Sequence, residues 1–265
     1  MEAIINYTKL DYLEYRYIKR DGCNCIEHIN FTFTILVVKS GYLNIKINTK
    51  NYIVKSNEIL LLNIFEKHQC IDCENETEYS VFSVNYFYFK NLLNKFYKNN
   101  NILQLNKHII KNKNIVENFN SLANEFITQN SLKLHHIFNL LLIELFEENI
   151  FIAKSLNEYT ILDRTFIYIA KHYNKPITLK ELADFSKISE QKILYIFNKV
   201  YRQTPYQFIL SYRVFKSKKL LNKGYSITEV ALSVGFYDQS HLHKHFKKHF
   251  GITPKEYLLS LSQKK

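Results

Sequence analysis

The feature that most constrains the fold of this chain is an internal repeat in its last hundred residues. The stretch ITLKELADFSKISEQKILYIFNKVYRQTPYQF (177–208) aligns with SITEVALSVGFYDQSHLHKHFKKHFGITPKEY (226–257). Glu181 and Ala183 recur 48 residues later as Glu229 and Ala231, whereas five further positions recur 49 residues later: Ile193, Phe197, Thr204, Pro205 and Phe208 return as Leu242, Phe246, Thr253, Pro254 and Tyr257. One extra residue in the second turn explains the change of offset. Two copies are too few for a solenoid, so the repeat indicates a duplicated small module.

Each copy of the repeat predicts a helix-turn-helix. A short helix with a Glu-Leu-Ala or Glu-Val-Ala core is followed by a turn and by a second helix that ends shortly before Thr-Pro. Between the copies, YQFILSYRVFKSKKLLNKG (206–224) predicts a long linking helix that is closed by Gly224. At ~1.5 Å per residue this helix spans roughly 28 Å, close to the ~34 Å between successive major-groove faces of DNA.

The positive charge of the chain is concentrated in the same region. The whole sequence has a net charge of +12, from 36 Lys and Arg against 24 Asp and Glu. Residues 161–265 contain 19 Lys and Arg against 7 Asp and Glu, which accounts for all of this excess and leaves residues 1–160 neutral. A lysine-rich genome would act on both parts alike. The asymmetry therefore predicts a polyanion-binding module attached to a part with another task.

The front part of the chain predicts antiparallel β-structure. Its strand-like segments are rich in β-branched and aromatic residues and are separated by turn-forming residues. They cover residues 31–38, 42–48, 51–56, 58–65 and 78–87, with an acidic loop at 72–77. This spacing is typical of a sandwich or small barrel. After residue 114 the apolar residues follow a helical period, which predicts one helix through 115–126 and a second over roughly 131–152.

These patterns predict an α+β chain in two parts. Residues 1–152 form an antiparallel β barrel or sandwich with two helices, 153–160 (AKSLNEYT) form a polar linker, and 161–265 form an all-α domain of two helix-turn-helix subdomains joined by a linking helix. The helix at 131–152 has more apolar surface than one small sheet needs, which leaves a dimer contact and core packing as alternatives. With no secretory signal and no apolar run near the ~18 residues of a membrane span, we expect a cytoplasmic protein without a membrane partner.

The last hundred residues resemble the AraC family of bacterial transcription regulators, over about 160–258. The motif positions are Ala231, Gly235-Phe236, Asp238-Gln239-Ser240, Phe246-Lys247, Phe250-Gly251 and Thr253-Pro254. The resemblance implies that each second helix lies in a major groove of promoter DNA, and that RNA polymerase is a further partner. The front part is similar to the family's sensory half, a cupin-like barrel followed by two helices, which implies a small-molecule effector or a homodimer. It departs from that pattern at Ser56-Asn57-Glu58, where a Gly-Asp turn is usual.

The second helix of the second copy contains four histidines, and this raises the question of a metal site. His241, His245 and His249 have the i, i+4, i+8 spacing of ligands on one helix face. At about 100° per residue, however, His245 and His249 lie at the edge of the apolar stripe that begins with Leu242. No Asp, Glu or Cys is close enough in sequence to complete a site. We therefore expect this helix to read a DNA groove, and we expect no metal or other cofactor.

The resemblance assigns DNA contacts residue by residue. In the second reading helix the base- and backbone-contacting positions are Gln239, Ser240, His241, His243 and Lys244, and Lys247 and Lys248 follow where the helix leaves the groove. In the first, the matching positions are Gln191, Leu194 and Tyr195, and the cations available for phosphates are Lys192, Lys199 and Arg202. Leu194 and Tyr195 offer no bidentate donor, so this helix reads thymine methyl groups or mainly positions the protein. Core packing is the alternative for Leu194, which is adjacent to Ile193.

The cysteines and histidines of the front part suggest no catalytic site. Cys23, Cys25, Cys70 and Cys73 form two close pairs whose spacing could serve a zinc-thiolate sensor or, by resemblance to DNA-repair regulators, an alkyl acceptor, but inert thiols are the simpler interpretation. Only His28 and His68 lie in the expected barrel, and the chain has no Gly-rich phosphate loop or G-x-S-x-G motif. The sequence therefore predicts a DNA-binding transcription regulator, more in keeping with an activator than a repressor, and not an enzyme. The thiolate-based regulator with the same DNA reader is the alternative.

Overall fold

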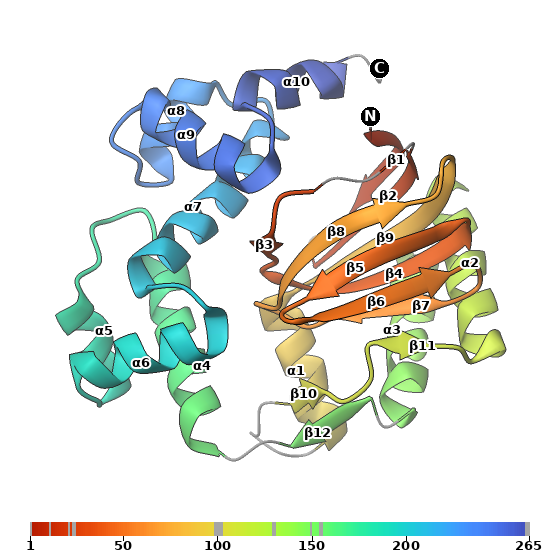
Figure 1. Ribbon diagram of the computed structural model, residues 1–265, viewed down its shortest axis with the longest axis horizontal. Helices are drawn as coiled ribbons and strands as arrows, with labels where there is room; N and C mark the ends of the chain where they lie inside the picture. Colours follow the sequence, from red (N-terminus) through yellow and green to blue (C-terminus); the bar gives the residue numbers. More distant parts are fainter. Residues whose placement is uncertain are drawn as a thin grey trace. The chain divides into compact units, whose positions relative to one another are not determined.

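The structure of the protein, a computed structural model, describes residues 2–10, 12–20, 22, 25–97, 103–128, 131–148, 150–153 and 156–262. Contacts divide the chain into two units, whose elements are labelled in Figure 1. The front unit comprises Met1–Asn24 and Ile29–Lys154, and the C-terminal unit comprises Cys25–His28 and Ser155–Lys265. No helix in the described ranges is both long and apolar enough to cross a membrane.

The front unit is built on two β-sheets. Its strands are β1 (Glu2–Lys9), β2 (Leu13–Arg20), β3 (His28–Ile29), β4 (Thr32–Ser40), β5 (Tyr42–Ile47), β6 (Lys50–Lys55), β7 (Ile59–Leu62), β8 (Lys67–Cys73), β9 (Thr77–Asn85), β10 (Leu103–Leu105), β11 (Ile109–Ile110) and β12 (Phe151–Ala153). One sheet has the order β1-β2-β9-β4-β7-β11 with antiparallel neighbours, and the other has the order β3-β8-β5-β6. A short pair, β10 and β12, stands apart from both. The predicted antiparallel β-structure is confirmed.

The side chains of β4 show that the six-stranded sheet is the middle layer of the front unit, between the four-stranded sheet and the helices. The strand's side chains alternate between two cores: Phe33, Ile35 and Val37 belong to the core shared with the helices, whereas Leu36 and Val38 face the four-stranded sheet. A strand buried on both faces reads as a continuous apolar run, which is what FTFTILVV is. At the end of β4, Gly41 has φ +74°, and a Cβ there would lie 2.5 Å from Thr77 Oγ1. Only glycine fits this turn.

Three helices cover the other face of this sheet: α1 (Tyr86–Tyr97), α2 (Lys113–Thr128) and α3 (Ser131–Glu147). Phe82 of β9 joins sheet to helices, with ring centroids 5.5 Å from Phe119 of α2 and 6.2 Å from Phe138 of α3. These fully buried rings supply much of the apolar area that stabilises the unit. The core packing proposed as one alternative for α3 is therefore present along its inner face.

The front unit differs from the sequence prediction in several elements. Helix α1 and the strands β1, β2, β3, β8, β10 and β11 were not predicted, and the expected loop at 72–77 is shorter because β8 extends to Cys73. The strand expected at 78–87 ends at Asn85, whose Oδ1 accepts a hydrogen bond from Phe87 N at 2.9 Å and so opens α1. The helix expected to reach 152 ends at Glu147, and β12 follows.

The C-terminal unit is all-α, as predicted. Its helices are α4 (Leu156–His172), α5 (Leu179–Ser186), α6 (Glu190–Tyr201), α7 (Pro205–Leu221), α8 (Ile227–Ser233), α9 (Gln239–Phe250) and α10 (Pro254–Ser262). Helix α4 begins inside the stretch expected to be a linker, of which residues 154–155 lie outside the described residues. The boundary expected at 161 was therefore about one turn too late. Leu162, Phe166 and Ile169 bury one face of α4 at helical spacing, which explains why the helix forms despite its polar start.

The two copies of the repeat fold alike, down to their helix caps. Thr178 and Glu181 form a capping box at the start of α5, and Ser226 and Glu229 form the same box at the start of α8. Thr204 accepts from Gln207 N at the start of α7, and Thr253 accepts from Glu256 N at the start of α10 in the same way. The caps satisfy main-chain N–H groups that a helix start leaves without partners. The duplicated helix-turn-helix is confirmed, with α6 and α9 as the second helices.

Candidate nucleic-acid interface

Helix α6 presents all of its predicted contact residues to solvent. Ser189 caps the helix by accepting a hydrogen bond from Lys192 N at 3.2 Å, and Ile193, Ile196 and Phe197 anchor its inner face in the core. The side chains predicted to contact DNA are exposed; they are Gln191, Lys192, Leu194, Tyr195, Lys199 and Arg202. Arg202 follows the helix in a left-handed conformation, φ 54°, that ends α6. The structure thus places these residues on one continuous surface of the helix and its C-terminal end.

Tyr195 stands between two lysines on this surface. The ammonium of Lys192 lies 5.1 Å and that of Lys199 lies 5.5 Å from the centroid of the Tyr195 ring, within the range of cation–π attraction. The ring is 53% exposed and Leu194 beside it is 38% exposed. Leu194 is not one of the buried core residues, so the structure does not favour core packing, the alternative considered above. Helix α6 offers an apolar patch bordered by cations.

Helix α9 has a more polar outer face. Asp238 caps it by accepting a hydrogen bond from His241 N at 2.7 Å, and Leu242 and Phe246 are buried beneath it. Gln239 is half-buried and its Oε1 accepts a hydrogen bond from the Thr228 hydroxyl of α8 at 2.8 Å, which fixes the orientation of the amide. The remaining polar positions are exposed; they are Ser240, Lys244, Lys247 and Lys248.

The histidines of α9 are less available than the sequence suggested. His241 and His245 are half-buried, and their ring centroids lie 5.1 Å and 5.8 Å from that of Phe236. Burial, reinforced by His241, Lys248 and Lys244, lowers the pKa of His245 below the usual histidine value, which favours the neutral ring. His243 Nε2 is buried and makes no hydrogen bond in the described structure, so a DNA contact through that atom requires the ring to turn. In the described residues, no group of three or more His, Cys, Asp or Glu side chains could hold a metal.

Two residues of the C-terminal unit were missed by sequence reasoning. Tyr237, immediately before the cap of α9, is 87% exposed, which is exceptional for so large an aromatic side chain. Its position beside the motif residues Phe236 and Asp238 was the available signal. Arg213 of α7 is only 8% exposed, although it lies in a basic helix. Its hydrogen-bond partners are main-chain carbonyl groups, which no sequence pattern predicts.

The cysteines form no recognisable site in the described structure. Cys73, at the end of β8, is buried and disulfide-bonded, which corrects the interpretation of this residue as an inert thiol. Cys25 and Cys70 are half-buried, and Cys23 lies outside the described residues. A disulfide sulfur is not the thiolate that a zinc site or alkyl acceptor uses. The thiolate-based alternative is therefore not supported.

Comparison with known proteins identifies the C-terminal unit. A family model for a helix-turn-helix domain matches residues 182–260, which include α6, α7 and α9. The chain carries an AraC-type helix-turn-helix domain. Such domains are the DNA-binding part of bacterial transcription regulators, so DNA is a partner of this chain.

Curated relatives share this domain. YbfI of Bacillus subtilis strain 168, an uncharacterized HTH-type transcriptional regulator, is 23% identical over 222 residues, which are 81% of this chain and 80% of that protein. The melibiose operon regulatory protein of Escherichia coli strain K12 is 30% identical over 91 residues, 34% of this chain and 30% of that protein. The chain thus matches less than a third of the length of the melibiose regulator.

The fold of the whole chain is similar to that of ToxT from Vibrio cholerae. The apo form from strain SCE256 has a TM-score of 0.75 at 13% identity and covers 96% of this chain and 99% of ToxT. A structure of wild-type ToxT bound to an unsaturated fatty acid has a TM-score of 0.71 at 12% identity, with 96% and 97% covered. At this identity the likeness establishes the fold, an N-terminal β unit followed by a helical AraC-type unit.

Proposed function

We propose that the protein is a sequence-specific transcription regulator, an activator, that reads promoter DNA with α6 and α9 in successive major grooves. One observation carries the proposal. The two helix-turn-helix copies share the same caps and flank a single linking helix, α7, and both expose polar and cationic residues on the outer face of the second helix. A linking helix of 17 residues, about 26 Å at ~1.5 Å per residue, suits two readers on one face of B-DNA.

In this proposal α9 supplies most of the base reading. Gln239 is held by Thr228 with its amide NH₂ group free of that bond, and a fixed amide is a suitable partner for adenine N7 and N6. Lys244 is proposed to reach a base edge, and Lys247 and Lys248 to contact phosphates where the helix leaves the groove. Tyr237, because it is so exposed at the start of α9, is proposed to donate its hydroxyl hydrogen to a phosphate.

Helix α6 is proposed to read mainly by shape. Leu194 and the Tyr195 ring suit thymine methyl groups, while Lys192, Lys199 and Arg202 neutralise phosphates around them. Among the predicted contact residues of this face, Gln191 is the one whose side-chain amide can both donate to and accept from a base edge. We therefore expect an A·T-rich half-site for α6 and a more strictly defined one for α9.

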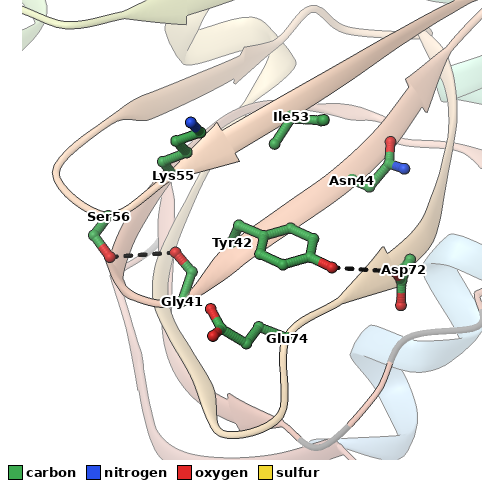
Figure 2. Close-up of a pocket in the computed structure, with 8 residues that line it drawn as sticks. All are labelled: Gly41, Tyr42, Asn44, Ile53, Lys55, Ser56, Asp72 and Glu74. Atoms are coloured by element: carbon green, nitrogen blue, oxygen red, sulfur yellow. Dashed lines mark hydrogen bonds between the residues drawn. The ribbon is translucent and has the colours of Figure 1, made fainter.

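The front unit is proposed to bind a small effector or a second copy of the chain. The space between its two sheets is filled by apolar side chains such as Leu43, Ile45 and Val54, but a groove of about 640 Å³ lies open on the outer side of β5, β6 and β8. Figure 2 shows Tyr42 at its centre, with its hydroxyl donating to Asp72 Oδ2 at 3.3 Å. Leu140 and Ile143 of α3 are exposed on the side away from the core, which suits a homodimer contact. ToxT, which has this fold, has been solved with an unsaturated fatty acid bound, and this supports the proposal of a small ligand.

Selection of DNA ligands from a random duplex library with the full chain tests the DNA-reading proposal. The expected result is a motif of two parts whose centres lie about one helical turn, ~10 bp, apart. Enrichment of no motif, or of a single short element, would refute reading by two helices. Placing the selected site at several distances upstream of a reporter promoter then tests activation, with RNA polymerase as the partner, because repression without any activating position would refute the proposed sign.

A further inference from the structure

Arg213 joins the two helix-turn-helix copies through three hydrogen bonds. Its Nε donates to Tyr173 O at 2.7 Å, its Nη1 to Gly235 O at 2.7 Å, and its Nη2 to Lys175 O at 2.8 Å. All three acceptors are main-chain carbonyls. Two of them follow α4, which leads into the first copy, and the third is in the turn between α8 and α9 of the second copy. One side chain of the linking helix therefore holds both copies.

The two main chains that Arg213 joins approach each other closely. Gly235 has φ +90°, and a Cβ built there would lie 3.0 Å from Asn174 C and O and 3.0 Å from Arg213 Cζ. No larger residue fits without moving one of the copies. Tyr173 reinforces the contact, since its ring packs against the core of the second copy and lies 5.4 Å from the ring of Tyr212.

Each end of this joint is connected to a reading helix through packed elements. After Gly235 comes Phe236, which is buried and in ring contact with His241 and His245 of α9. Three residues after Lys175 is Thr178, which caps α5, and α5 packs against α6. A change at the joint is therefore transmitted to both reading helices through well-packed elements, which move as units rather than deform.

We propose that Arg213 is a positioning residue that sets the spacing between the two DNA half-sites by locking α6 and α9 in one relative arrangement. This inference rests on the proposed two-helix reading of DNA. Arg213 is nearly buried, so it acts through the joint and not by touching DNA. A guanidinium suits the task because its donors form a rigid fork that can satisfy three acceptors at once, whereas a lysine ammonium on a flexible stem cannot hold the same geometry.

The test compares spacing preference in the full chain and its variants. Arg213→Lys keeps the charge and loses the fork, and Arg213→Met keeps the stem and loses all three bonds. Arg164→Met is the control, because Arg164 is an exposed arginine of α4 in the same unit. DNA is selected with each protein from the random duplex library, and affinity is then measured on duplexes with the selected spacing and with one base pair more or fewer.

We expect the wild type and the control to select a single spacing. Both Arg213 variants should accept neighbouring spacings as well. If the competent arrangement is populated about a tenth of the time without the fork, affinity at the original spacing falls about tenfold, while affinity at the shifted spacings is kept or improved. Because Arg213→Met leaves buried carbonyls without donors, circular dichroism and thermal unfolding accompany each measurement. If Arg213→Met does not fold, Arg213→Lys decides.

Two other outcomes have separate meanings. Equal loss of affinity at every spacing, with the same single spacing selected, would show that Arg213 only stabilises the unit and would overturn the inference while leaving two-helix reading intact. Failure of the wild type to select a two-part motif would instead refute the proposed function and the inference with it. Gly235→Ala provides an independent check, since it disturbs the same joint while keeping Arg213, and it should broaden the spacing in the same way.

Discussion

Lys244 and Lys248 of α9 offer a matched pair of substitutions on one exposed helix face. Both side chains are exposed, and the core beneath the helix is made by Leu242 and Phe246. Neither lysine is needed for folding, so alanine at either position should change the free energy of unfolding by no more than about 0.5 kcal/mol. Differences in DNA binding can then be assigned to contacts and not to a loss of structure.

The two substitutions should differ in the kind of affinity that they remove. Lys244→Ala should cost roughly 1–3 kcal/mol on the specific site, about 5- to 150-fold in Kd, and much less on random DNA, because a base contact is lost. Lys248→Ala should weaken binding to both duplexes alike. It should also make the slope of log K against log salt concentration shallower by about 0.9, the contribution of one phosphate contact. Between 50 and 200 mM salt, a fourfold change, this variant should lose about 3.5-fold less affinity than the wild type.

Fluorescence anisotropy on the selected duplex and on a random duplex, at both salt concentrations, measures these four affinities for each protein. Thermal unfolding of each variant provides the control for stability. Equal weakening of both duplexes by Lys244→Ala would refute base reading by this lysine, and α9 would then be a positioning element. A salt slope unchanged by Lys248→Ala would remove the phosphate contact from the proposal.

Three further predictions concern the two units and their side chains. A fragment of residues 156–265 should fold and bind the selected duplex with a steep salt dependence, whereas gel shifts with residues 1–153 should show no comparable binding. Replacing Cys70 and Cys73 with serine should leave DNA affinity within about threefold, because neither residue belongs to the DNA-binding unit, although loss of the Cys73 disulfide should lower the stability of the front unit. Elemental analysis should find no stoichiometric zinc, and one zinc per chain would contradict this. Because the pKa of His245 is lowered in the folded state, the neutral ring contributes stability that is complete above the ordinary pKa of 6.5 and is lost as pH falls below it. Chemical unfolding should therefore show that the free energy of unfolding falls less between pH 7.5 and pH 5 for His245→Gln than for the wild type.

The C-terminal unit could be predicted from sequence because its signals are local. Short local motifs mark where its helices begin, such as the capping boxes Thr178 with Glu181 and Ser226 with Glu229, and the same motif occurs in both copies of the repeat. Fewer elements of the front unit could be predicted from the sequence. The run Tyr86 to Phe89 has the aromatic composition of a strand, yet it forms a helix because Asn85 caps it and Phe89 packs on the sheet core.

Most of the other elements that the sequence did not predict are strands at a sheet edge or next to one. Strand β1 lies at the edge of the six-stranded sheet, and β2 beside it reads LEYRYIKR, with charged residues among the apolar ones. Such a strand is recognised by its partners rather than by its own composition, since a half-exposed strand carries only a weak alternation. The uneven distribution of charge along the sequence indicated a division into two units. The composition of the strands, by contrast, did not indicate their order in the sheets.

The charge of the C-terminal unit also shows where counting residues misleads. Residues 161–265 contain 19 Lys and Arg, but several of these serve the unit itself. Arg213 is engaged by three carbonyls, and Lys218 lies 5.1 Å and 5.5 Å from the rings of Phe250 and Tyr257. The cations on the two reading helices and their ends are six: Lys192, Lys199, Arg202, Lys244, Lys247 and Lys248. If all six contact phosphates, the slope of log K against log salt concentration is about −5. The slope is shallower if Lys244 contacts a base instead. If all 19 cations contacted phosphates, the slope would be about −17. A slope near the smaller value would mean that most cations of this unit do not contact DNA phosphates.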